Sequence, residues 1–251
     1  MDTLTALNDM TASQADRMFA AGMAGEINEI NDEVSAALLK IVADPAESEE
    51  LRAVAAISLG PVLELVDLME PEDVDEEAPI SGEAFLRIKK TLHRLFEDTS
   101  IPKEVRRRIL EASVRSEDEW HDDAVAAAYR SGERDWVLTA VFAMRFVGGF
   151  ERQVLESLNN PNEEIHVEAI QAAGAAEMDA AWPHLRVIIK DRQAPKPLLI
   201  AAILAAGEIG GDDATEVLEK LPPSDDEDIA AATDEALSLI YDEAREETED
   251  F

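Results

Sequence analysis

An apolar segment of nine or ten residues recurs along this chain, and after the first interval its spacing is nearly constant. Its clearest copies are residues 51–60 (LRAVAAISLG) and 199–207 (LIAAILAAG). Weaker copies occupy residues 105–114, 137–145, 166–174 and 230–238. The last residues of successive copies are 54, 31, 29, 33 and 31 positions apart. A unit of this length cannot bury its apolar side alone, so the spacing predicts stacked repeats that share one core.

Each repeat is predicted to be helical, because its apolar residues return every three or four positions. Two such runs lie outside the recurring segment, and the first is expected to end near Asp44-Pro45. Their members are Ile27, Ile30, Val34, Leu38 and Ile41, and then Phe85, Ile88, Leu92 and Leu95. Alanine, the best helix former, occurs 40 times. The sequence therefore predicts an all-α protein made of tightly packed helix pairs.

Small residues have predicted places in these pairs. Gly60, Gly174 and Gly207 close three copies of the segment, where a left-handed cap at a helix end would cost no side-chain strain. The alanine pairs 55–56, 172–173 and 201–202 are expected to face a neighbouring helix and let it approach closely.

The second helix of a pair opens with an apolar residue and arginine, and it closes with alanine, leucine and glycine. The closest matches are Leu51-Arg52 with Ser58-Leu59-Gly60, then Val105-Arg106, then residues 205–211. This pattern resembles HEAT repeats of the bacterial and archaeal type, over roughly residues 30–243. The resemblance implies a right-handed α-α superhelix of about six helix pairs, a HEAT/armadillo-like solenoid. Trp136, His166 and Pro197 stand where the family's arginine is expected, so its Asp–Arg ladder would be incomplete.

The repeat accounts for the domain organisation that we expect. Residues 1–251 would form a single solenoid domain, with an N-terminal capping helix region at 1–29. The long first interval indicates an acidic insertion loop at 67–82, in which residues 67–79 hold seven acids and no base. The C-terminal stretch 224–251 has twelve acids and one arginine. Residues 244–251 are expected to form an acidic C-terminal tail, of which 246–250 fray into solvent.

The charge limits the partners. The chain has 56 acidic and 22 basic residues, a formal charge of −34, which repels nucleic acid and anionic membranes. We therefore expect a protein or peptide partner that is basic or apolar, and neither a membrane nor nucleic acid. Seven of the basic residues are lysine, a balance that resembles proteins of salt-loving microbes but also suits an ordinary acidic bacterial protein. The N-terminus has no basic segment before an apolar stretch, so a cytoplasmic location is expected.

Signals for catalysis and cofactors are weak. The chain has no cysteine, no Gly-x-Ser-x-Gly turn and no phosphate-cradling glycine loop, so we predict no catalytic residue and no cofactor. One local metal candidate combines Glu117 and His121, one helical turn apart, with Asp118 and Asp122. Acids are favoured at the start of a helix in any case, so an acid-rich first turn is the preferred interpretation and no metal is predicted.

Two features could bind a partner. Residues 85–115 hold nine basic and four acidic side chains, either an anion-binding patch or, as we favour, a segment neutralised by pairs such as Glu104–Arg108 and Arg107–Glu111. Phe142, Phe146 and Phe150 are spaced to lie on one helix face, as core or as a groove with Arg145 as its polar anchor. The partner-binding candidates are Arg87, Lys90, Arg94, Arg107, Arg108, Trp136, Arg145 and Phe146.

These observations favour a non-enzymatic scaffold that binds a protein or peptide on a concave surface lined by the second helices. Two alternatives stay open. One is an enzyme similar in architecture to the HEAT-like phycobilin lyases. The other is an acidic mimic of nucleic acid, whose carboxylates would imitate phosphates.

Overall fold

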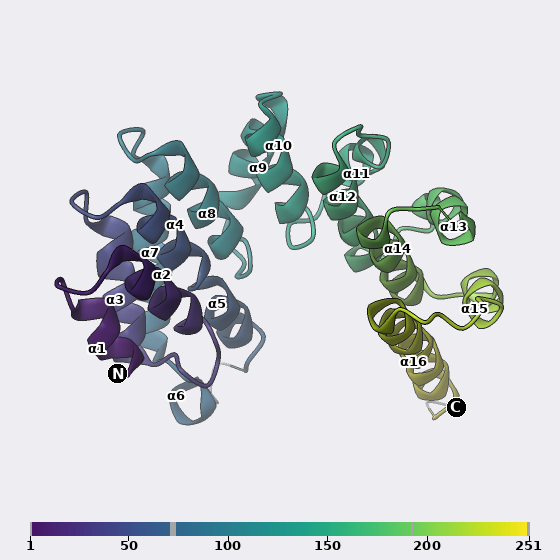
Figure 1. Cartoon of the computed structure of the whole chain (residues 1–251), viewed down its shortest axis with the longest axis horizontal. Helices are drawn as coiled ribbons and strands as arrows, with labels where there is room; N and C mark the ends of the chain where they lie inside the picture. The colour runs from purple at the N-terminus through teal and green to yellow at the C-terminus, as the bar shows by residue number, and fades with distance from the viewer. Residues whose placement is uncertain (1, 71–73, 192, 250–251) are drawn as a thin grey trace. The chain divides into compact units, whose positions relative to one another are not determined.

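The computed structural model describes residues 2–70, 74–191 and 193–249 (Figure 1). Helices make up its regular secondary structure, and the described residues contain no strand. The chain divides into two compact units, Met1–Ala124 and Val125–Phe251, which are treated separately below. The protein is therefore all-α, as the repeat predicts. The prediction of one domain and the handedness of a superhelix stay predictions.

The N-terminal unit is built from helix pairs. In each, the first helix packs against the second: α1 (Thr3–Asn8) on α2 (Gln14–Met23), α3 (Asp32–Ala43) on α4 (Glu49–Ile57), and α7 (Gly82–Glu97) on α8 (Lys103–Ser113). The second helices also contact one another in chain order, α2 with α4 and α4 with α8. This nearest-neighbour stacking within the unit is the arrangement that helical repeats use to share a core.

Side-chain caps explain why these helices begin where they do. Ser13, Asn31, Ser48 and Ser81 directly precede α2, α3, α4 and α7, and each side chain accepts a hydrogen bond from a backbone N–H of the first turn. These N–H groups have no partner inside the helix, so the caps define the helix starts. The helix predicted from Ile27 onward accordingly begins at Asp32, after the Asn31 cap, and Ile27 is exposed.

Three arginines fasten the N-terminal pairs, and each is the fourth residue of a second helix. The Nε atom donates to a carbonyl ten residues earlier, near the end of the first helix: Arg17 to Leu7 (3.3 Å), Arg52 to Val42 (2.9 Å) and Arg106 to Phe96 (2.7 Å). A helix end leaves carbonyls without partners, so the arginine satisfies one of them and joins the two helices. This is the structural role of the apolar-arginine pattern in the sequence.

The chain between the second and third N-terminal pairs is longer than the predicted acidic loop 67–82. An additional helix, α5 (Gly60–Asp67), precedes that loop, follows α4 almost directly and packs against α8. Pro61 favours this restart, since its fixed φ suits the first turn of a helix. Part of the predicted loop, residues 71–73, lies outside the described residues, and the short α6 (Val74–Glu77) follows. Residues 74–77 of the predicted loop are therefore helical, and α5 ends at the loop's first residue, Asp67.

The C-terminal unit repeats the pairing. It contains α10 (Arg134–Ala143), α11 (Glu151–Ser157), α12 (Glu163–Ala175), a 3-10 turn (Asp179–Ala181), α13 (Trp182–Lys190), α14 (Lys196–Ile209), α15 (Asp212–Glu219) and α16 (Glu227–Glu249). The helix α9 (His121–Arg130) crosses the boundary between the units. The first helices α11, α13 and α15 pack on α12, α14 and α16, and the second helices contact one another from α10 to α16. With those of the N-terminal unit, six pairs are in contact among the described residues. Five of them are predicted pairs, and the sixth, α1 with α2, lies in the region predicted as a cap.

Glycine brings the second helices of this unit close together. A Cβ atom added to Gly174 would lie 2.8 Å from the Cα of Ala205, and one added to Gly207 would lie 2.6 Å from the Cα of Ala236. The predicted left-handed caps at Gly60, Gly174 and Gly207 are therefore wrong. The glycines with positive φ angles are instead Gly132, Gly149, Gly210 and Gly211. Close helix approach, and not backbone conformation, explains Gly174 and Gly207.

Three other boundaries differ from the prediction. The region 1–29 is a full helix pair, because α2 has its own cap and stacks on α4. The backbone of the predicted tail 244–251 is helical through Glu249, as its good helix formers favour, and residues 250–251 lie outside the described residues. The predicted aromatic stripe is broken, since α10 ends at Ala143 and Gly149, at φ 84°, places Phe150 at the start of α11.

Candidate functional site

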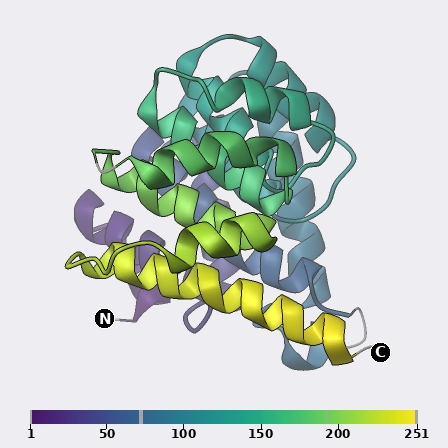
Figure 2. The same ribbon diagram turned by 90° about the vertical axis from the view of Figure 1, so that its right-hand side faces the viewer.

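The C-terminal unit contains a cavity of about 960 Å³ between α13, α14, α15 and α16. Its origin is a difference in helix spacing. Gly207 lets α14 and α16 pack closely, whereas α13 and α15 contact each other at few positions. Figure 2 shows this unit from the side, with the long α16 in yellow. Tight packing of the second helices with loose packing of the first helices leaves space between the pairs.

The walls of the cavity are largely apolar. Ile189, Ile203 and Leu218 are buried at its base. The side chains that are half-buried along its walls are Leu199, Val217, Leu221, Ile229 and Leu237. Ala230 and Thr233 of α16 complete the wall with small side chains. Half-buried apolar walls with polar groups at the edge are the usual construction of a site that takes part of a ligand.

Charged side chains form the rim. Arg186, Lys190 and Lys220 contribute positive charge, and Asp191, Asp213, Glu216, Glu219 and Asp234 contribute negative charge. Glu216 forms an ion pair with Lys220, and this hydrogen bond, followed by the charge of Lys220, lowers the pKa of the Glu216 carboxyl. Tyr241 donates a 2.7 Å hydrogen bond to Glu219. The acids outnumber the bases, so the rim attracts cationic groups.

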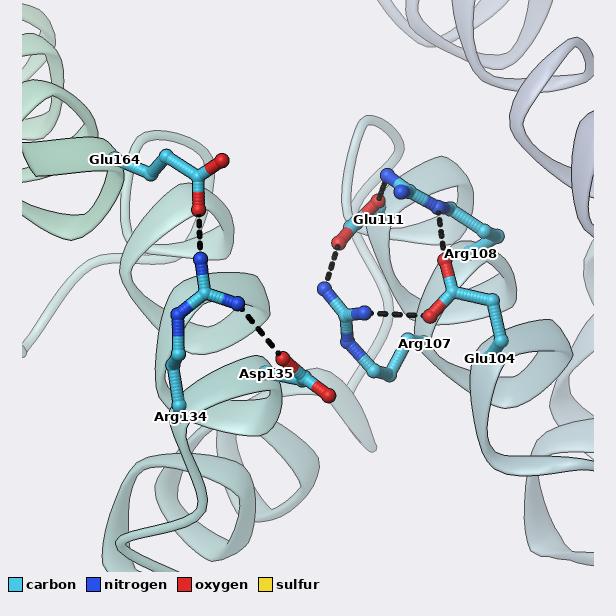
Figure 3. Close-up of polar contacts among 7 residues, drawn as sticks. All are labelled: Glu104, Arg107, Arg108, Glu111, Arg134, Asp135 and Glu164. Carbon is cyan, nitrogen blue, oxygen red and sulfur yellow. Dashed lines mark hydrogen bonds and ion pairs between the residues drawn. The ribbon is translucent and has the colours of Figure 1, made fainter. Parts of the chain in front are cut away.

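The predicted basic patch lies on α7 and α8. Arg87, Lys90 and Arg94 are exposed on α7, and Arg87 lies 3.9 Å from Glu83. Arg107 and Arg108 of α8 are part of a network of four side chains, drawn in Figure 3. Arg107 contacts Glu104 at 2.5 Å and Glu111 at 3.6 Å, and Arg108 contacts the same two carboxylates at 2.9 and 2.6 Å. The predicted i, i+4 pairs are present, so these two arginines face carboxylates of their own helix.

The predicted aromatic site is divided. Trp136 is half-buried on α10, and Phe146 follows the end of that helix, 5.5 Å from Phe142 between ring centroids. The guanidinium of Arg145 lies 5.6 and 5.7 Å from the centroids of these two phenylalanine rings and donates a 3.2 Å hydrogen bond to Gln171 of α12. Arg145 therefore joins α10 to the next second helix. Its role as an anchor for a partner stays a prediction.

The metal candidate around residues 117–122 is not assembled as one helical face. The helix α9 begins at His121, so Glu117 and Asp118 precede it. The His121 side chain is buried, with 2% of its surface exposed, and it packs against the Trp120 ring. This burial lowers the pKa of His121 to about 4. Among the described residues, no group of three or more histidine, aspartate or glutamate side chains has metal-binding geometry. The described helices are also too short or too polar to cross a membrane.

The cavity contains none of the eight partner-binding candidates predicted from the sequence. Its walls come from four helices and from the loop 220–224, and their apolar residues have the ordinary spacing of a helical core. One local signal was available, because Leu221-Pro222-Pro223-Ser224 separates α15 from α16 and keeps a half-buried leucine next to exposed prolines. That signal identifies a helix junction but not the space beside it.

Comparisons with known proteins give only distant structural similarity. No protein-family model matches the chain, and no curated protein matches its sequence. Human deoxyhypusine hydroxylase, solved in complex with glycerol, is similar with a TM-score of 0.45 and 16% identity, over 96% of this chain and 83% of that one. Escherichia coli YibA has a TM-score of 0.46 and 17% identity, over 94% of this chain and 91% of that one. These values decide nothing about activity, and the fold rests on the helix contacts described above.

Proposed function

We propose that this protein is a non-enzymatic binding scaffold whose C-terminal unit holds an apolar side chain of a basic protein segment. The observation that carries the proposal is the cavity of about 960 Å³ with its apolar, half-buried walls. Its volume has room for several large side chains, and Leu199, Val217 and Leu237 offer an anchoring side chain a surface that is now only partly covered. Burying a leucine or phenylalanine there contributes roughly 1.5–3 kcal/mol to binding.

Electrostatics supports a basic partner. Residues 125–251 hold 27 acidic and 10 basic side chains, a formal charge of −17. The rim itself has five acids and three bases. A partner segment with lysines or arginines beside its apolar anchor would therefore be drawn to the rim and held there by ion pairs, more strongly at low salt.

The proposal is tested by filling the cavity. Ala230→Trp places an indole against the cavity wall, whereas Ala231→Trp places the same group on the neighbouring exposed position of α16. The probe is a fluorescent synthetic helical peptide of lysine and leucine, and its affinity is measured by anisotropy. Ala230→Trp should weaken binding at least tenfold and Ala231→Trp less than twofold, provided that both variants melt as the parent does.

A second peptide separates apolar recognition from simple charge attraction. Replacing each leucine by alanine keeps the positive charge but removes the anchor. If the alanine peptide binds equally well, or if Ala230→Trp binds the leucine peptide as the parent does, the cavity is not the binding site and the proposal fails.

A further inference from the structure

The fourth residue of a second helix differs along the chain in side chain and in partner. In α2, α4 and α8 it is arginine, which donates a hydrogen bond to the first helix of its own pair. In α12 the fourth residue is His166. His166 contacts His184 of α13, which belongs to the following pair.

The two imidazoles point their ring nitrogens at each other. The Nε2 atoms are 2.8 Å apart, the ring centroids 5.0 Å apart, and the planes meet at 62°. A nitrogen pair at this distance shares one proton, so one Nε2 donates and the other accepts. The accepting ring then carries its own proton on Nδ1. Two nitrogens from two different helices thus converge on one point.

Both rings are in the neutral charge state that metal binding requires. Burial lowers the pKa of His166, with a smaller contribution from the charge of His184, and burial also lowers the pKa of His184. Neutral imidazole is the ligating form, so neither ring must lose a charge at neutral pH before it binds. Each side chain is only half-buried, which leaves an edge of the pair open to a hydrated ion.

We propose that His166 and His184 form a two-imidazole site for a divalent transition-metal ion such as Ni²⁺. Metal–nitrogen bonds of about 2.0–2.1 Å place two adjacent ligands roughly 2.9–3.3 Å apart, close to the separation in the hydrogen-bonded pair. On binding, the donor ring moves its proton from Nε2 to Nδ1, and both Nε2 lone pairs then face the metal. No electron is transferred and no net proton is released. Water completes the coordination, and the ion joins α12 to α13.

The site is distinct from the cavity proposed to hold a partner. The residues that line the cavity include Arg186, Ile189 and Lys190 of α13 but neither histidine. The metal would therefore fix one wall of the cavity from outside it. Because the chain has 56 acidic residues, the competing ligands for a divalent ion are carboxylates. Magnesium prefers oxygen ligands, so an excess of Mg²⁺ occupies them and leaves imidazole pairs free.

The chain has four histidines, so each ring can be followed in one nuclear magnetic resonance spectrum. The experiment titrates Ni²⁺ into the full chain at neutral pH with excess Mg²⁺ and records the histidine ring signals. We expect the signals of His166 and His184 to broaden at Ni²⁺ concentrations at least tenfold below those that affect His93 and His121. Calorimetry should give one equivalent of Ni²⁺ for this step.

His184→Gln should weaken this binding at least tenfold, and so should His166→Gln. The matched control His93→Gln changes a histidine of α7 that lies beside Glu97 and should leave binding unchanged. If the variants at 166 or 184 are less stable, the parent protein still decides the question, because its rings report binding directly. Simultaneous broadening of all four rings, or Ni²⁺ affinity in His184→Gln equal to that of the parent, would overturn the proposal.

Discussion

The two units solve the same packing problem with different residues. In the N-terminal unit, Arg17, Arg52 and Arg106 join the two helices of a pair through a backbone carbonyl. In the C-terminal unit the fourth residues of α10, α12, α14 and α16 are Val137, His166, Leu199 and Ala230. There Gly174 and Gly207 let successive second helices approach closely, an approach that the N-terminal unit has where Gly25, after α2, meets Ser58 at the end of α4. In the N-terminal unit, the arginine hydrogen bonds hold the two helices of each pair together. In the C-terminal unit, α14 stacks closely on α16, and a cavity remains beside α13 and α15.

The largest expected effect on stability comes from Arg17, which is bonded to a carbonyl and to a carboxylate. Arg17 also forms two 2.7 Å contacts with Glu47, and both side chains are at most 10% exposed. Arg17→Met should lower the free energy of unfolding by about 3 kcal/mol, because it leaves the Glu47 carboxylate buried without its counter-charge. The measurement is urea denaturation followed by circular dichroism.

Two variants check this interpretation of Arg17. Arg94→Met removes an exposed arginine of α7 and should change stability by less than about 0.5 kcal/mol. The double variant Arg17→Met with Glu47→Met should be less destabilised than Arg17→Met alone, since no charge is then left unpaired. A double variant that loses the sum of both single effects would contradict this role.

The free energy of unfolding is expected to depend on pH through His121, near the C-terminal end of the N-terminal unit. Burial holds the pKa of His121 at about 4, below its ordinary value of 6.5. The unfolded chain therefore binds a proton more readily, so this histidine's contribution to stability is lost as pH falls from 6.5 to 4. The full effect is roughly 3 kcal/mol. The carboxylates titrate in the same range, so the test is the difference between the parent and His121→Gln, which should shrink as pH falls. A difference that is constant with pH would show that His121 is not buried in its neutral form.

The close stacking in the C-terminal unit predicts a smaller effect. Gly207→Ala places a methyl group 2.6 Å from the Cα of Ala236, so α14 and α16 must separate. Overpacking of this kind costs about 1–3 kcal/mol. The matched control is Gly22→Ala in α2, where a Cβ meets no atom within 4 Å and the better helix former should stabilise the protein slightly. Equal melting temperatures for Gly207→Ala and Gly22→Ala would contradict the claim that close helix packing explains Gly207.

The smallest effect is expected at the surface. Lys220 and Glu216 form an ion pair on the rim of the cavity, and both side chains are more than 60% exposed. Water and salt screen such a pair, so Lys220→Met should leave the melting temperature nearly unchanged. The same variant should strengthen binding of the lysine–leucine peptide, because it removes a positive charge from the rim. Weaker binding would mean that Lys220 contacts the partner directly.

The sequence predicts the helices well where local signals are complete. The segment 51–60 identifies α4 because Ser48, Arg52 and the alanines each give a signal within a few residues. The pairs Glu104–Arg108 and Arg107–Glu111 are predictable for the same reason, since helix geometry alone brings them together. The spacing of Phe142, Phe146 and Phe150 indicates one face only if the helix continues, and Gly148-Gly149 is the local signal that it does not.

Contacts and spaces between different helices cannot be predicted from such local signals. The counterparts of Arg52 were expected at Trp136 and Pro197, but counting from the observed helix starts places Val137 and Leu199 there. The contact of His166 with His184 depends on how α13 follows α12, and the cavity depends on how far α13 stays from α15. Such spacings result from packing across several helices, which one sequence does not encode in a local pattern.

Hydrogen–deuterium exchange with and without the lysine–leucine peptide tests the central claim most directly, namely that the cavity holds an apolar side chain of a basic partner. The account predicts slower exchange in the segments 212–224 and 227–237, which contain the cavity-lining residues of α15, α16 and the loop between them, and no change in residues 32–57 of the N-terminal unit. The protection should disappear in Ala230→Trp and persist in Ala231→Trp. Protection centred on α7 and α8, or protection that Ala230→Trp leaves intact, would contradict the claim.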